Sequence, residues 1–362
     1  MAILGSKKNG YRRLVQLGFA AVTLVVGVQF YLFVASLENG IIPGFDRPPG
    51  VEAFLPISAL VSVRHFFITH TVNPIHPSGL ILFVLICISA LVVKKGFCAF
   101  VCPIGLISEL LASLNRKLFS RPWHLPRWPD LILRSIKYLI AAFFIWNIFF
   151  QMPGPAVTGF VHSTYNKFAD VSMLFFFTQI SPRALIILLV LVALTLAIPH
   201  FWCRYLCPYG ALLGAIGLFS LARIRRDPAR CTQCRACERH CPSRIKITAK
   251  PSITSPECSF CQTCVETCPE KGAITPSLSG RVRFSPWITT VIIVGIFVLG
   301  ITGARVTGHW QNQVSKSEYL GFVLQRQMAL MKHQMGDPEV RQRMIRIMKN
   351  IRESQRMGDK PQ

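Results

Sequence analysis

The sequence predicts an all-α polytopic membrane protein into which a small α+β domain is inserted. Three observations support this fold class. Of the 362 residues, 51% are hydrophobic and only 15% are charged, whereas a soluble domain usually carries about 25% charged residues. The apolar residues form long runs, and eight of the 13 cysteines lie together in one polar segment. This composition excludes a disordered tail, a collagen and a small secreted disulfide-rich protein.

Five apolar runs are long enough, or nearly so, to cross a hydrocarbon layer of about 30 Å, which takes about 20 residues. They are residues 14–36, 79–93, 131–150, 183–199 and 286–303. A sixth stretch, Ala53–Thr69, is interrupted by Pro56, so we expect an interfacial or re-entrant helix there. The first run follows four basic residues as a signal peptide does, but its length favours an uncleaved anchor.

The distribution of basic residues predicts the orientation, because short cytoplasmic loops hold an excess of Lys and Arg. With the N-terminus inside, segments 1–13, 94–130 and 200–285 hold 23 basic residues, whereas loops 37–78 and 151–182 hold 3. This asymmetry places every cysteine motif on the cytoplasmic side of the membrane. The same topology puts the C-terminal tail, with eleven basic residues, on the outer side.

Eight cysteines form two matched runs, each reading C-x2-C-x2-C-x3-C-P. This is the spacing of bacterial ferredoxins that hold [4Fe–4S] clusters, in which the fourth Cys of each run serves the other cluster. We therefore expect one cluster on Cys231, Cys234, Cys237 and Cys268, and a second on Cys258, Cys261, Cys264 and Cys241. A zinc site needs only one group of four ligands, and disulfides are rare in the cytoplasm. The segment is therefore typical of one-electron transfer.

Four further cysteines lie in two similar segments. Phe97-Cys98-Ala99-Phe100-Val101-Cys102-Pro103-Ile104-Gly105 matches Trp202-Cys203-Arg204-Tyr205-Leu206-Cys207-Pro208-Tyr209-Gly210, and each copy follows the inner end of a predicted span. The recurrence predicts an internally duplicated unit of two spans plus a C-x3-C-P motif. Spacing of i and i+4 places both thiols of a copy on one helix face, and topology places both copies at one membrane surface.

Three interpretations of these four cysteines stay open. Cys98, Cys102, Cys203 and Cys207 would together suit a third metal or iron–sulfur centre, since four thiolates suit a soft metal. They would also serve as two redox-active dithiols, or as small buried residues of a structural turn. Cys87, alone within the second predicted span, is expected to be an apolar core residue.

The order of spans, two C-x3-C-P segments and a C-terminal pair of ferredoxin runs resembles the NapH, NosR and MauN group of membrane polyferredoxins. The likeness covers about residues 10–305 and includes Arg47-Pro48-Pro49-Gly50-Val51-Glu52-Ala53-Phe54-Leu55-Pro56-Ile57 and Leu125-Pro126-Arg127-Trp128. The resemblance implies an inner-membrane electron-transfer protein that links the quinol pool to periplasmic reductases. Its redox partner would be a protein of cytochrome or ferredoxin type. A quinol site would need groups that accept protons. The outer-side candidates are Glu52, His65, His70, His76, His162 and Asp170, and Glu52 and His65 flank the interfacial segment, where they could approach one pocket.

A rival function is metal handling, in which the C-x3-C-P thiols reduce copper or supply electrons for metalloenzyme maturation. A third is a sensor whose clusters only report redox state. Nucleic acid is not an expected partner, because the net charge of +24 follows the predicted topology and no RNA-binding motif is present. The basic residues around the first cluster instead suit an acidic redox partner.

The predicted organisation has four parts. They are a membrane domain over residues 1–220, a cytoplasmic ferredoxin domain over 221–280, a fifth span over 286–303 and a basic, Met-rich helical tail over 304–362. Met331, His333 and Met335 in the tail would suit Cu(I). The alternative is an amphipathic helix on a lipid surface or a partner.

Overall fold

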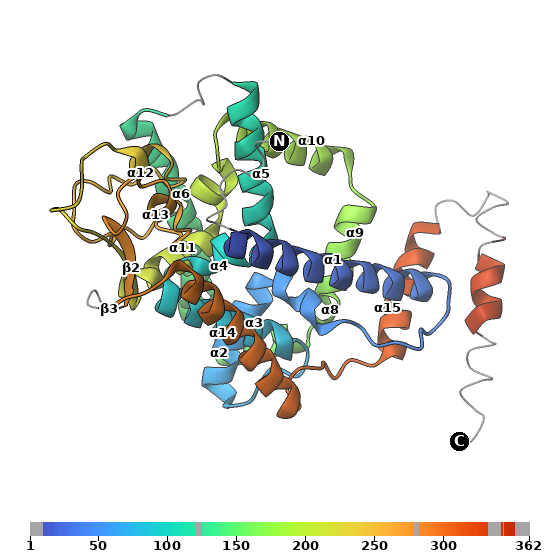
Figure 1. Cartoon of the computed structure of the whole chain (residues 1–362). Coiled ribbons are helices and arrows are strands. Elements are labelled where there is room, and N and C mark those ends of the chain that lie inside the picture. The colour runs from blue at the N-terminus through green and yellow to red at the C-terminus, as the bar shows by residue number, and fades with distance from the viewer. Residues whose placement is uncertain (1–9, 120–124, 279–281, 332–341, 343, 352–362) are drawn as a thin grey trace. The chain divides into compact units, whose positions relative to one another are not determined.

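The computed structural model describes residues 10–119, 125–278, 282–331, 342 and 344–351 (Figure 1). The chain divides into two compact units. The first comprises residues 1–23, 81–152 and 181–306, and the second comprises residues 24–80, 153–180 and 307–362. The structure is mostly helical, as the composition predicts. Helices α1 (Gly10–Glu38) and α3 (Pro77–Val93) contribute residues to both units.

The remaining helices of the first unit contain or flank the cysteine motifs. They are α4 (Gly96–Phe100), α5 (Pro103–Leu118), α6 (Arg127–Trp146) with the π-helical turn η3 (Asn147–Gln151), α10 (Pro182–Ala197), the π-helical turn η4 (Trp202–Leu206), α11 (Pro208–Ile216), η5 (Gly217–Phe219), α12 (Ala236–Arg239), α13 (Thr263–Glu266) and α14 (Pro286–Val306). Proline opens many of these helices, because its fixed φ suits the first turn and its missing N–H would have no partner there. Gly300 of α14 packs against Leu85 of α3, where a Cβ would lie 2.3 Å from the leucine side chain.

Three helices in the described part of the chain are long and apolar enough to cross a membrane: Gly10–Glu38, Trp128–Gln151 and Pro286–Val306. A bent pair, α9 (Ala169–Thr178) and α10, adds a fourth if the two helices form one span, since they meet at 81°. These elements coincide with the first, third, fourth and fifth predicted spans. The second coincides with α3, which has 17 residues. The count of five spans stays a prediction.

A small antiparallel sheet closes the cysteine-rich segment. Its strands β1 (Ala222–Arg226), β2 (Ile274–Leu278) and β3 (Val282–Arg283) lie in that order, and Ala222 pairs with Leu278 and Arg226 with Ile274. The chain between β1 and β2 carries both ferredoxin runs and the short helices α12 and α13 (Figure 1). The two ends of this segment are therefore tied together, which makes it an α+β insertion in a helical chain.

The second unit consists of short helices around an aromatic core. They are η2 (Pro49–Phe54), α2 (Pro56–Thr69), α7 (Gly154–His162), α8 (Thr164–Lys167), α9 and α15 (Lys316–Met331). Helix α2 covers most of the stretch expected to be interfacial. The Tyr319 ring of α15 meets the Phe33 and Phe168 rings edge-on, with centroids 5.8 and 5.2 Å apart. Of the predicted tail ligands, His333 and Met335 lie outside the described residues.

Candidate functional site

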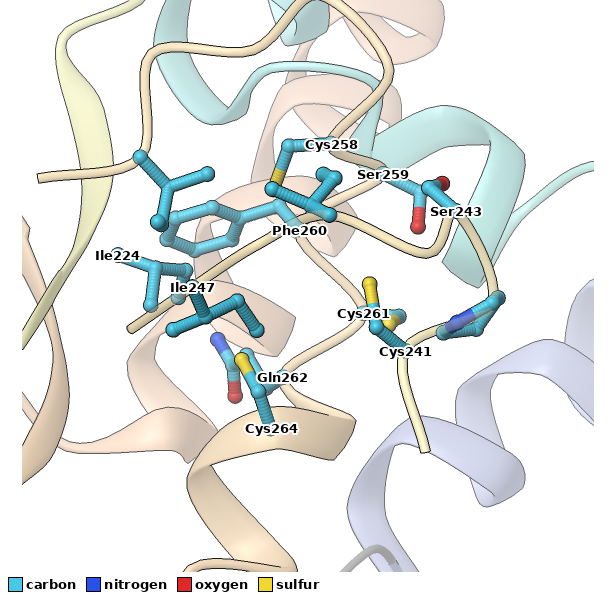
Figure 2. Close-up of a pocket in the computed structure, with 13 residues that line it drawn as sticks. Ile224, Cys241, Ser243, Ile247, Cys258, Ser259, Phe260, Cys261, Gln262 and Cys264 are labelled. Carbon is cyan, nitrogen blue, oxygen red and sulfur yellow. The ribbon is translucent and has the colours of Figure 1, made fainter. Parts of the chain in front are cut away.

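The four cysteines expected to hold the second cluster surround one pocket. Cys241, Cys258, Cys261 and Cys264 all line it. Figure 2 shows Cys241 and Cys261 side by side, with the apolar side chains of Phe260 and Ile247 on the opposite side. Three thiols thus come from one run and the fourth from the other run. A low-polarity wall beside four thiols fits an iron–sulfur cluster, which needs sulfur ligands and limited water access.

The two runs share an unusual backbone. In the first run Gln233 and Arg235 have φ values of 55° and 56°, and at the same offsets in the second run Phe260 and Gln262 have 53° and 62°. Left-handed φ is uncommon for residues other than glycine and is retained where the surrounding structure requires it. In each run a backbone N–H hydrogen-bonds a thiol, from Ala236 to Cys234 and from Phe260 to Cys258, as N–H groups do in anion-binding concavities. Both runs are therefore shaped to wrap thiolates around a centre.

The cysteines expected to hold the first cluster also come together. The thiol of Cys268 interacts electrostatically with those of Cys231 and Cys234, and Cys237 interacts with Cys268. Cys234 is exposed, and a hydrogen bond from the Ala236 N–H lowers its pKa. Burial instead raises the pKa of Cys258 in the second set to about 11. Exposure thus varies within the first set, where Cys234 is exposed and Cys237 is buried, whereas all four cysteines of the second set are partly exposed.

The two C-x3-C-P copies bring their four thiols to one place. Cys98 interacts electrostatically with Cys102, Cys203 and Cys207, and Cys203 with Cys102. Within the described residues, no three Cys, His, Asp or Glu side chains are grouped to hold a single metal ion. An iron–sulfur cube bonds each thiolate to a different iron, so its ligands do not converge on one atom. The donor set fits a third centre of that kind.

The prediction that both thiols of a copy lie on one helix face is wrong. Cys98 lies within α4, whereas Cys102 is the N-cap of α5; Cys203 lies in η4, whereas Cys207 caps α11. The proline after the second Cys ends the preceding helix and starts a new one, because it lacks an N–H and disfavours helical φ/ψ before it. The C-x3-C spacing of each copy therefore places its two thiols on opposite sides of a helix break.

The glycine of each C-P-x-G sequence allows this break to be tight. A Cβ at Gly105 would lie 2.2 Å from the Cys98 carbonyl oxygen. In the second copy, the Gly210 N–H donates to Cys207 Sγ at 3.3 Å. The first turn of the following helix therefore folds back over the preceding cysteine.

Polar side chains that sequence patterns did not indicate hold these turns. Asp130 accepts two hydrogen bonds from Arg204, at 2.8 and 2.9 Å, and one from Tyr205 at 2.6 Å. In the first copy, Arg12 donates to the Ala99 carbonyl at 3.3 Å and pairs with Glu109. Arg204 and Tyr205 lie inside the second motif, whereas no sequence pattern indicated Asp130 as their partner.

Glu257, immediately before Cys258, is the centre of another polar group. Lys137 Nζ and Lys95 Nζ lie 2.7 and 3.2 Å from its Oε2, and Tyr138 OH donates to its Oε1 at 2.7 Å. Burial alone would raise the pKa of Glu257, but the two lysines and the hydrogen bonds lower it to about 2. This carboxylate is therefore ionised beside the second cysteine set.

In the second unit, three of the predicted proton-accepting residues belong to one buried network. Arg47 pairs with Glu52 at 2.8 Å and with Asp170 at 2.5 Å, and His76 Nδ1 lies 3.3 Å from Glu52. Burial opposes ionisation of both Glu52 and His76. The pairings nevertheless lower the pKa of Glu52 and raise that of His76. Tyr319, which sequence patterns did not indicate, donates to Asp170 at 3.4 Å.

The other candidate histidines lie elsewhere in the second unit. His65 is buried in α2, where its Nδ1 is 3.4 Å from Thr69 Oγ1, and it interacts electrostatically with His162. His70 caps the end of the same helix in a left-handed conformation.

A mostly helical chain with candidate spans and two ferredoxin cysteine loops defines a membrane protein of the ferredoxin-type electron-transfer class. A family model described as "4Fe-4S binding domain" matches residues 75–123 and 180–226, and one described as "4Fe-4S dicluster domain" matches residues 223–269. The first model covers both C-x3-C-P motifs. The second covers both ferredoxin runs.

Similar proteins agree with this class. The chain is 37% identical over 316 residues to YccM of Escherichia coli, an electron transport protein by name, covering 85% of this chain and 88% of that protein. It is 31% identical to the ferredoxin-type protein NapH of Haemophilus influenzae, over 44% of this chain and 51% of NapH. MauN of Paracoccus denitrificans, a methylamine utilization ferredoxin-type protein, is 28% identical over 42% of this chain and 50% of its own length. No solved structure matches the chain.

This chain belongs to the NapH-like family of ferredoxin-type electron-transport proteins. The resemblance drawn from the cysteine motifs is thereby confirmed, and an iron–sulfur electron-transfer role follows from it.

Proposed function

We propose that this protein passes electrons between the quinol pool of a bacterial inner membrane and a redox partner protein on its cytoplasmic or periplasmic side. The observation that carries the proposal is the pocket in which Cys241 of one run joins Cys258, Cys261 and Cys264 of the other. This interleaving is what two-cluster ferredoxins require. A [4Fe–4S] cluster bound there would supply one-electron transfer, and such a cluster offers no acid, base or nucleophile.

The first set, Cys231, Cys234, Cys237 and Cys268, is proposed to hold the other [4Fe–4S] cluster, and Cys98, Cys102, Cys203 and Cys207 a third centre. Oxidation of a quinol releases two electrons and two protons, so one-electron carriers must accept the electrons singly. The positive-inside distribution of Lys and Arg supports a cytoplasmic ferredoxin domain over residues 221–280.

The first set is proposed to face the redox partner. Cys234 is exposed, and the side chains of Arg230, Arg235 and Arg239 around it are exposed as well. A basic rim of this kind attracts an acidic protein and speeds its encounter.

The quinol site is proposed in the second unit, where the candidate proton acceptors lie. The network of Glu52, His76 and Asp170 is buried and internally paired with Arg47. A carboxylate and an imidazole in contact can exchange a proton with each other, which suits removal of quinol protons. His65 and His162 form a second candidate group.

Anaerobic purification tests the proposal directly. We expect about eight irons per chain, with matching acid-labile sulfide, for two clusters and about twelve for three. Added quinol should then produce the EPR signal of reduced clusters. Clusters that stay oxidised with quinol, but are reduced by dithionite, would refute the quinol function while leaving the ferredoxin class intact.

A second candidate function is copper reduction or electron supply for metalloenzyme maturation. It is favoured by the convergence of the four C-x3-C-P thiols, since thiolates suit Cu(I). Replacing Cys98, Cys102, Cys203 and Cys207 by serine separates the two. If quinol-linked reduction of the ferredoxin clusters survives, these thiols do not lie on the electron path.

A further inference from the structure

The loop that precedes the second cysteine set rests on the turn that precedes the first C-x3-C-P motif. Both belong to the first unit. Glu257 of the loop pairs with Lys95 of the turn, and Lys94 Nζ lies 3.5 Å from the Ser255 carbonyl oxygen. Lys94 and Lys95 are 2% and 5% exposed. Two adjacent lysines are thus buried where the inserted domain meets the helices.

The packing at this point leaves no spare room. A Cβ at Gly214 of α11 would lie 2.8 Å from Lys95 Cε and 2.9 Å from the Pro256 carbonyl oxygen. On the loop side, Ser243 Oγ donates to the Glu257 carbonyl at 2.7 Å, which ties the loop to the chain just after Cys241. The ion pair is therefore held in one place and is not a flexible surface contact.

The charges of this junction reach the thiols on both sides. Lys95 interacts electrostatically with Cys98 and Cys203, one thiol from each C-x3-C-P copy. Lys94 interacts with Cys258 of the second set. Glu257 is directly bonded along the chain to Cys258. Charges that are buried act over short distances with little screening, so they influence the redox groups beside them.

We propose that the Lys95–Glu257 pair is the electrostatic junction between the C-x3-C-P thiols and the second cysteine set, and that it sets the reduction potentials of the centres on its two sides. The inference rests on the proposed function, because it takes Cys241, Cys258, Cys261 and Cys264 as cluster ligands. Lys95 and Glu257 are positioning residues, because they act on the redox centres through the thiols beside them.

The sign of each effect follows from charge. A reduced cluster carries one more negative charge than an oxidised one, so a nearby cation favours reduction and a nearby anion opposes it. Lys95→Met should therefore lower the potential of an adjacent centre, whereas Glu257→Gln should raise that of the second set. A pair that served only to dock the loop would not give opposite shifts.

An EPR-monitored redox titration of the anaerobically purified full-length protein tests the proposal. Lys95→Met should fold, because Lys137 and Tyr138 still satisfy Glu257. Lys250→Met removes an exposed lysine of the same domain and serves as the matched control, with no shift expected.

Opposite shifts in Lys95→Met and Glu257→Gln, with full iron content, would support the junction. Unchanged potentials, or shifts in the same direction with clusters retained, would overturn it. A double variant, Lys95→Met with Glu257→Gln, should return the second-set potential toward that of the wild type, which covers the case in which Glu257→Gln alone does not fold. Absence of clusters from the wild-type protein would instead refute the proposed function.

Discussion

Alanine in place of Gly105 tests how the C-x3-C-P turns are built. The added Cβ would lie 2.2 Å from the Cys98 carbonyl oxygen, about 1 Å inside ordinary van der Waals contact. The same change at Gly210 places a Cβ 3.6 Å from the Cys203 carbonyl oxygen, which is normal contact. The two copies share one motif, so each variant is the matched control of the other.

The two substitutions are expected to change the free energy of unfolding in different directions. Overpacking of a tight site costs about 1–3 kcal/mol, whereas alanine in a helix is favoured over glycine by up to about 1 kcal/mol. Gly105→Ala should therefore lower the free energy of unfolding by about 1–3 kcal/mol, and Gly210→Ala should leave it unchanged or raise it slightly. At about 1.3 °C per kcal/mol for a chain of 362 residues, the midpoint of Gly105→Ala should fall by about 1–4 °C.

Thermal unfolding followed by circular dichroism, on protein in detergent under anaerobic conditions, measures both variants. Because the Cys98 carbonyl must move, Gly105→Ala should also disturb the nearby thiols. Equal midpoints in the two variants, or a larger loss in Gly210→Ala, would refute the inferred tightness of the first turn.

Three further predictions follow from the sites. Cys241→Ser should remove about four irons per chain in an iron assay, because the second set loses a ligand, whereas Cys87→Ser should leave the content unchanged. His76→Gln should destabilise the protein at about pH 6 but much less at about pH 9 in thermal unfolding, since a raised folded-state pKa gives stability that is lost as pH rises through it. Arg235→Glu with Arg239→Glu should slow reduction of succinylated, acidic cytochrome c more than that of native, basic cytochrome c. The slowing should weaken at high salt, and equal effects on both cytochromes would argue against the basic rim as a docking surface.

The regular cysteine spacing made the ferredoxin segment predictable, because three ligands of each set lie within seven consecutive residues and the matching run supplies the fourth. The backbone conformation that presents these ligands could not be predicted in the same way. Phe260 and Gln262 adopt left-handed φ, and neither residue type signals it in a sequence. The requirement comes from the loop as a whole, in which three thiols must face one point.

The buried network of the second unit illustrates a different limit. Glu52, His76 and Asp170 could be singled out as polar residues near apolar stretches. Their grouping, however, depends on contacts between distant segments: Arg47 and Asp170 are 123 residues apart in the chain. Tyr319 joins them from a helix close to the C-terminus. Contacts between such distant segments are set by packing, which local patterns do not encode.

The two C-x3-C-P copies are alike in sequence, but their surroundings are not. Lys95 and His200 occupy the same position, three residues before the first Cys of each copy. His200 Nδ1 lies 3.0 Å from Ser108 of α5, whereas Lys95 packs on Gly214 of α11 and pairs with Glu257. Each position thus contacts the helix that follows the other copy, but only the first carries a permanent charge. Because the ferredoxin segment follows the second copy and folds back to the first, Lys95 meets Glu257 there, whereas the equivalent His200 meets the Ser108 hydroxyl.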